Sequence, residues 1–114
     1  MPYFTNAHTD VVAVAGMEYD PDGCAGEGKN FITFGWYNLA PNQRKYMPGN
    51  WRYFYWYAES KDGLVWGEGP YTVYVRRSRF VKCLGETSTQ DYIAKMRQHD
   101  TEKFPGGVRL IRST

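Results

Sequence analysis

Aromatic rings are the side chains in this sequence with the clearest capacity for recognition chemistry. The chain holds four Trp and ten Tyr in 114 residues, which is more polar-tipped rings than the core of one small domain needs. We therefore predict that some rings are exposed and engage a partner protein, a glycan or an identical subunit, while the others fill the core. The expected contact rings are Trp36, Tyr37, Tyr53, Tyr55, Tyr57 and Trp66.

A cluster of arginines is the second feature suited to recognition. Arg76, Arg77 and Arg79 lie close in sequence, and each guanidinium offers a planar fork that fits a carboxylate or a phosphate. Residues 1–70 carry five Lys and Arg against eight Asp and Glu, a balance of −3, whereas residues 71–114 carry nine against four, a balance of +5. The alternative function is therefore docking of the basic C-terminal half on nucleic acid or on an acidic protein surface. A charged edge strand that resists aggregation is the simpler explanation of the arginines.

The sequence lacks the residue patterns of known catalytic and metal sites. His8 and His99 are its two histidines, and no nucleophile-elbow, zinc-helix or phosphate-loop motif is present. Glu59 and Asp62 flank a hairpin turn, where ordinary solvation explains them better than a glycosidase pair does. The Gly-rich loop 20–29 lacks the ligand spacing of a calcium-binding loop. We predict a protein that is not an enzyme and that needs no cofactor or metal.

The two cysteines and the N-terminus bear on the compartment. Cys24 and Cys83 lack the spacing of a zinc site or of a dithiol redox motif, and the sequence leaves open whether they form a disulfide. Residues 1–6 lack the pattern of a secretory leader, and no apolar run approaches the roughly 18 residues of a membrane span. We expect a chain without a membrane span, cytoplasmic as written, with export by another route left open.

The local patterns predict one mainly β domain over residues 1–114, a small antiparallel β-sandwich with a short C-terminal helix. Runs of β-branched and aromatic residues alternate with turn residues at about the 8–12-residue spacing of sandwiches and small barrels. In the tail, residues 86–114, Tyr92, Ile93 and Met96 recur at a helical spacing, so a helix is expected around residues 89–99, added to a complete sheet. Strands are expected at residues 3–6, 11–19, 30–39, 44–47, 51–58, 64–66, 71–75 and 108–112.

Two of the expected strands are apolar on both faces, which places them at the centre of the sheet. Strict alternation in residues 30–39 puts Trp36 on the face of Phe34 and Tyr37 on the opposite face. In residues 51–58 the rings at odd positions share one face, and those at even positions share the other. We expect core anchors among Phe34, Trp36, Phe54 and Trp56.

The order of the aromatic motifs resembles that of a known bacterial family. Gly35-Trp36-Tyr37-Asn38-Leu39-Ala40-Pro41 is followed by Tyr55-Trp56-Tyr57-Ala58-Glu59 and then by Trp66-Gly67. This pattern resembles the core of the family called domain of unknown function 1036, over about residues 3–84. The resemblance implies a family but no function. Family members often carry cysteines where this chain has residues 4–6 and Gln43, so the resemblance implies no disulfide for this chain.

Overall fold

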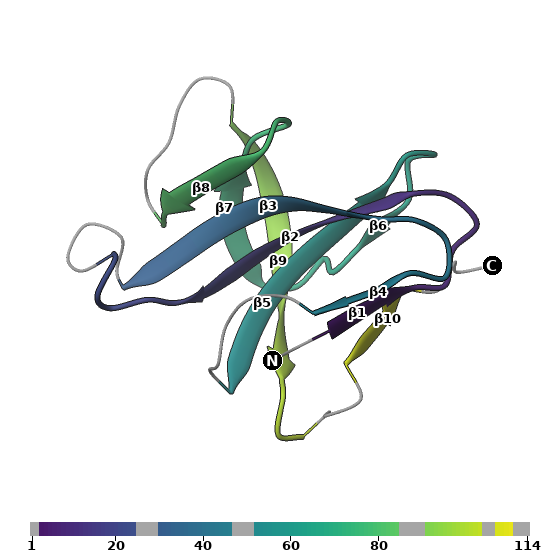
Figure 1. Ribbon diagram of the computed structural model, residues 1–114. Coiled ribbons are helices and arrows are strands. Elements are labelled where there is room, and N and C mark those ends of the chain that lie inside the picture. The colour runs from purple at the N-terminus through teal and green to yellow at the C-terminus, as the bar shows by residue number, and fades with distance from the viewer. Residues whose placement is uncertain (1–2, 25–29, 47–51, 85–90, 104–106, 111–114) are drawn as a thin grey trace.

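The computed structural model describes residues 3–24, 30–46, 52–84, 91–103 and 107–110, and these are mainly β (Figure 1). The mainly β prediction is therefore confirmed. The described part of the chain contains no helix, and so none with the length and apolarity to cross a membrane. Its strands are β1 (Tyr3–Asn6), β2 (Val12–Tyr19), β3 (Phe31–Leu39), β4 (Arg44–Tyr46), β5 (Tyr53–Ser60), β6 (Val65–Trp66), β7 (Tyr71–Val75), β8 (Phe80–Cys83), β9 (Tyr92–Asp100) and β10 (Val108–Leu110).

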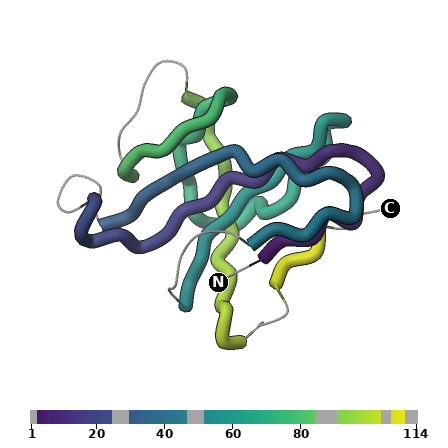
Figure 2. Tube along the Cα trace, viewed as in Figure 1, coloured from purple at the N-terminus to yellow at the C-terminus, as the bar shows by residue number. Residues whose placement is uncertain are grey.

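The larger sheet is antiparallel and strongly curled. Its strands follow the order β7-β9-β5-β2-β3-β8, and β6 pairs with β5. β7 and β8 stand at opposite ends of this order, yet only residues 76–79 connect them. A segment that short spans at most about 14 Å, so the sheet has to curl until its two ends meet. Figure 2 shows the chain passing directly from β7, in teal, into β8, in green.

The smaller sheet covers one face of the larger one. Its order is β10-β1-β4, with β1 parallel to β10 and antiparallel to β4. The side chains between the two sheets form what we call the inter-sheet core. Its buried members are Phe4, Val12, Val14, Phe34, Leu39, Phe54, Trp56, Ala58 and Leu110. Three of the four predicted core anchors lie here.

The other face of the larger sheet closes on itself. The curl encloses a second group of side chains, which we call the curl core, and Trp36 packs against it. The buried members of the curl core are Ala15, Met17, Tyr57, Val73, Val75, Phe80, Ala94 and Met96. Strands β2 and β5 contribute to both cores, which explains why their sequences are apolar on both faces.

The predicted C-terminal helix is wrong, because most of that segment is β9. Residues 92–96 pair with β7, and residues 97–100 pair with β5. Ala94 and Met96 are buried, while Ile93, Lys95 and Arg97 are exposed, which is the alternation of a strand. Pairing with these two strands along its whole length outweighs the weak helical spacing of the sequence. The segment is an internal strand of the sheet rather than an addition to it; residues 89 and 90 lie outside the described part.

A β-bulge in β3 changes the expected alternation of its rings. Val14 of β2 pairs with Tyr37 and Gly16 pairs with Phe34, so Gly35 and Trp36 together stand opposite one residue. A bulge of this kind shifts every later side chain to the other face. Trp36 therefore packs against the curl core, and Tyr37 packs against the inter-sheet core with Phe34. The predicted faces of these two rings are reversed.

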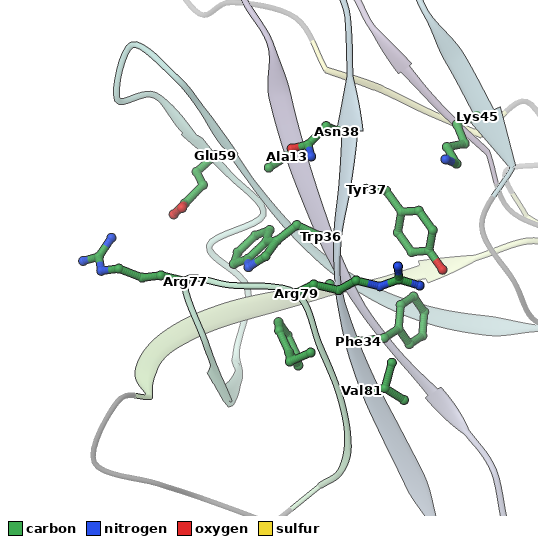
Figure 3. A pocket seen from close by; sticks show the side chains of 12 residues that line it. Ala13, Phe34, Trp36, Tyr37, Asn38, Lys45, Glu59, Arg77, Arg79 and Val81 are labelled. Carbon is green, nitrogen blue, oxygen red and sulfur yellow. The ribbon is translucent and has the colours of Figure 1, made fainter.

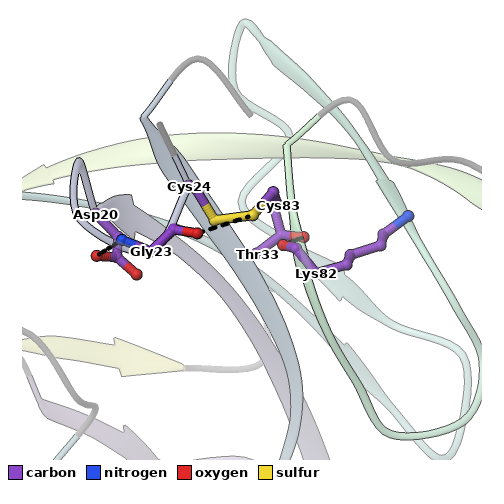
Figure 4. The surroundings of a disulfide bond; sticks show 6 residues. All are labelled: Asp20, Gly23, Cys24, Thr33, Lys82 and Cys83. Atoms are coloured by element: carbon purple, nitrogen blue, oxygen red, sulfur yellow. Dashed lines mark hydrogen bonds between the residues drawn. A yellow bond between two sulfur atoms is a disulfide. The ribbon is translucent and has the colours of Figure 1, made fainter. Parts of the chain in front are cut away.

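A disulfide ties the end of β8 to the turn that follows β2. Cys24 and Cys83 are bonded across a sequence separation of 59 residues, which answers the question that the sequence left open. Figure 4 shows the bond beside Thr33, whose hydroxyl donates a hydrogen bond to the carbonyl oxygen of Lys82 at 2.9 Å. The bond and this hydrogen bond both hold β8 against the first half of β3.

Candidate functional site

A pocket of about 620 Å³ opens where β8 stops pairing with β3 (Figure 3). Four of the residues predicted to bind a partner line it: Trp36, Tyr37, Arg77 and Arg79. The other lining residues are Ala13, Phe34, Gly35, Asn38, Lys45, Glu59, Phe80 and Val81. Rings and cations that the sequence analysis treated as separate features therefore meet in one site.

The ring of Trp36 forms a fixed wall of this pocket. Its Nε1 donates a hydrogen bond of 2.6 Å to the carbonyl oxygen of Arg76, in the turn between β7 and β8. The ring also meets Tyr57 and Phe80 edge to face, with centroid distances of 6.1 Å in both cases. These contacts hold the indole and the turn together, so the turn presents its arginines beside the ring.

Three cations surround the pocket. The guanidinium carbon of Arg77 lies 4.8 Å from the ring centroid of Tyr92, and Lys45 Nζ lies 5.0 Å from that of Tyr37. Arg77 and Arg79 are exposed, and within the described residues neither forms an ion pair with a carboxylate. Cations without a carboxylate partner attract an anion from solution.

Glu59 supplies the carboxylate of the pocket. Tyr57 donates a hydrogen bond of 2.9 Å to Glu59 Oε2, and Tyr92 donates one of 3.1 Å to Oε1. Burial, and then the hydrogen bond and charge of Glu59, raise the pKa of both tyrosines. Both hydroxyls therefore stay protonated as donors across the physiological pH range. The carboxylate is held in place by two neutral groups, and none of the other pocket-lining residues is acidic.

Arg76 does not join the other two arginines. Its Nε donates to Asp91 Oδ1 at 2.9 Å, and Lys82 Nζ donates to Asp91 Oδ2 at 2.6 Å. The side chains of Asp91 and Lys82 are almost fully buried. This group of charges ties β8 to the start of β9, so its role is structural and Arg76 is not a pocket residue.

Asp62 belongs to a separate hydrogen-bonded group at the hairpin turn after β5. His8 Nε2 lies 3.0 Å from both carboxylate oxygens of Asp62, and the Ser60 hydroxyl donates to the same carboxylate. The hydrogen bond from Ser60, and then that from His8, lower the pKa of Asp62. The carboxylate stands between the serine and the histidine, so His8 cannot activate the hydroxyl as a catalytic base would. Glu59 and Asp62 therefore belong to two different hydrogen-bonded groups.

The remaining predicted contact rings lie elsewhere. Tyr53 and Tyr55 line a smaller pocket of about 240 Å³ with Tyr19, Phe31 and Arg52. Tyr53 is well exposed, and the Arg52 guanidinium lies 5.1 Å from its ring centroid. This second site is aromatic and lies at the opposite end of β3 from Tyr37.

Two predicted contact rings serve the interior instead. Tyr57 is only 8% exposed and belongs to the curl core. Trp66 packs against the inter-sheet core and meets the ring of His8 at 5.5 Å. The Tyr57 ring is therefore buried, whereas the Trp66 ring is only partly buried. The described residues contain no group of three or more acidic, histidine or cysteine side chains that could hold a metal.

Comparisons with protein-family models, curated proteins and solved structures gave no match to this chain. The resemblance to the domain of unknown function 1036 therefore stays a prediction from its motifs.

Proposed function

We propose that this chain is a non-enzymatic binding module that engages an acidic partner protein. In this proposal the fold is a β-sandwich whose larger sheet curls, and the ligand site is the pocket beside β3. The proposal rests on one observation: the rings of Trp36 and Tyr37 and the cations Lys45, Arg77 and Arg79 line the same pocket of about 620 Å³. Apolar rings beside charged forks suit a protein segment that carries carboxylates.

The charge distribution favours a protein over nucleic acid. The net charge of the chain is +2, which is small for a protein that neutralises many phosphates. A glycan without charge would use the rings but gain nothing from the three cations. An acidic protein surface can contact both the rings and the cations of the pocket, because its carboxylates bind the cations and its apolar side chains pack on the rings.

The test is a charge reversal with a matched control. Arg77→Glu combined with Arg79→Glu reverses two of the three charges of the pocket. Lys95→Glu combined with Arg97→Glu makes the same change in net charge at exposed positions of β9. The probes are polyglutamate and a single-stranded RNA, each titrated at low and at moderate salt. Reversal in the pocket should weaken polyglutamate binding by about tenfold or more, and the control by much less.

Three results would contradict the proposal. Equal losses in the two variants would mean that only the overall charge matters. Tighter binding of RNA than of polyglutamate, with a steep dependence on salt, would favour the nucleic-acid function instead. Absence of polyglutamate binding to the parent chain would leave the pocket without the function assigned to it. The melting temperature of both variants checks that the fold is intact.

A second candidate site is the aromatic pocket near Tyr53. Tyr19, Tyr53 and Tyr71 are each at least about one-third exposed, and the ring of Tyr55 meets that of Tyr71 at 4.9 Å. Exposed rings of this kind fit a sugar face or an identical subunit. Tyr53→Ser should reduce binding to a panel of neutral oligosaccharides, or should shift the sedimentation of the chain toward monomer, and should leave polyglutamate binding unchanged.

A further inference from the structure

The outer edge of β3 is paired along only half of its length. β8 pairs with Ile32 to Gly35 and begins at Phe80, opposite Gly35. Trp36 lies in the bulge, and from Tyr37 to Leu39 the strand continues and pairs with β2 on its inner side. In the residues that the structure describes, no strand pairs with the outer side of this stretch. Figure 1 shows β8 beside the first part of β3 only. The Leu39 carbonyl oxygen accepts a hydrogen bond of 2.9 Å from Asn6 Nδ2. Apart from that oxygen, such an edge presents unpaired backbone groups to another chain.

The pocket surrounds this free edge. Phe34 and Tyr37 point toward the inter-sheet core, whereas Trp36 packs on the opposite face against the curl core. All three line the same pocket. A space that touches both faces of one strand has to pass around the edge of that strand. A ligand in the pocket can therefore reach the backbone of β3 as well as its side chains.

The charges at the edge are positive. Arg79 immediately precedes β8, Arg77 lies three residues before the first residue of β8, and Lys45 lies over the ring of Tyr37. Glu59 is set back from the edge, because Asn38, Ala13 and Glu59 are directly opposite one another on three successive strands. Two strand spacings separate it from the edge strand by roughly 10 Å. An approaching strand meets the cations first.

We propose that the acidic partner binds as an extended segment that adds a strand to β3 along Trp36 to Leu39, in line with β8. This inference rests on the proposed function and adds its binding mode. Main-chain hydrogen bonds to the free edge supply affinity, and the cations select glutamate or aspartate side chains. A second copy of this chain is disfavoured as the occupant, because pairing two β3 edges would bring the cations of both copies together.

Peptides with blocked backbone amides test the binding mode directly. The probe is an end-blocked peptide about seven residues long that alternates valine and glutamate. Its controls are the same peptide with lysine in place of glutamate, and two derivatives N-methylated at alternate amides, one for each edge of the peptide. The full chain is titrated with each peptide at up to about 1 mM, following Trp fluorescence and the exchange rates of backbone amides by NMR.

We expect the glutamate peptide to bind and the lysine peptide to bind at least about tenfold more weakly. N-methylation on one edge of the peptide should weaken binding about tenfold or more, since each lost hydrogen bond lowers affinity several-fold. N-methylation on the other edge should have little effect. Amide exchange should slow within residues 36–39, and sedimentation should show one chain for each complex.

Each contrary result has a defined meaning. If both methylated peptides bind as tightly as their parent, the acidic segment sits in the pocket through side chains alone, and the added strand is wrong while the proposed function stands. If the glutamate peptide does not bind, yet polyglutamate still distinguishes the pocket variant from its control, the same conclusion follows. If polyglutamate makes no such distinction, the proposed function and this inference both fail. Self-association through residues 36–39 would also overturn the inference.

Discussion

Replacing Met96 with alanine tests the placement of β9 within the core. Met96 is fully buried in the curl core, at a position of β9 that pairs with Tyr71 of β7. Ile93 lies on the same strand with a side chain of similar size, and it is 53% exposed. Met96→Ala removes buried apolar atoms and leaves a cavity, which typically costs about 2–5 kcal/mol of unfolding free energy. Ile93→Ala should cost about 1 kcal/mol or less, because its side chain is largely in water already.

Urea denaturation at neutral pH measures both values in parallel, with Trp fluorescence and far-UV circular dichroism as independent probes of two-state unfolding. Equal slopes of free energy against urea would show that both variants unfold from a similar compact state. The reasoning fails if Ile93→Ala costs as much as Met96→Ala. That result would place the two faces of β9 the other way round, or would place the strand outside the core.

Three further predictions concern the rest of the fold. Replacing Cys24 and Cys83 together by serine should cost about 4 kcal/mol in denaturant melts, from the loop of 59 residues that the bond closes; unchanged stability in a reducing agent would contradict this. The Arg52 guanidinium lowers the pKa of Asp100 to about 2 from an ordinary 3.8. The stabilisation from this ion pair is therefore present above pH 4 and is lost as the pH falls toward 2. Arg52→Gln should flatten this pH dependence in thermal melts across that range. Tyr92→Phe removes one of the two hydroxyl donors of the pocket carboxylate and should cost about 1–2 kcal/mol, with one high-pKa tyrosine fewer in an alkaline absorbance titration.

Local alternation was sufficient to predict the centre of the sheet. In β5 the apolar rings at even positions, Phe54 and Trp56, enter the inter-sheet core, and Tyr57 enters the curl core. A strand between two cores has to be apolar on both faces, and this requirement is visible in the sequence itself. The mainly β class follows from the same short runs and turns.

Long-range pairing decided the features that the sequence could not show. In residues 92–96, Tyr92, Ile93 and Met96 fit a helix, while Ala94 and Met96 fit a strand, and so short a stretch supports either period. The partners of β9 are residues 53–56 and 71–75, far away in sequence, and they determine the outcome. The bulge at Trp36 is likewise defined by its register against β2, which no local pattern contains.

The sequence was sufficient to predict that aromatic rings and arginines form the candidate site, but it did not show which residues line the same pocket. Trp36, Tyr37, Arg77 and Arg79 were expected as separate surfaces, and the curl of the sheet brings them together. Lys45 joins them from β4, the edge strand of the smaller sheet, and no signal in its neighbourhood pointed to it. The position of Glu59 had a signal that was not used: it stands two residues after Tyr57, on the same face of the strand.

The pocket and the curl have a common origin at Gly35. A Cβ atom at this residue would lie 2.7 Å from Phe80 Cε1 and 3.3 Å from the Cβ of Ala15, so only glycine lets the first residue of β8 pack directly on the sheet. The same residue belongs to the bulge that turns the Trp36 ring over the curl core. Pairing with β8 ends there, and the edge beyond is open. The site therefore lies where the sheet finishes closing on itself, which is why a pocket can form beside the two cores.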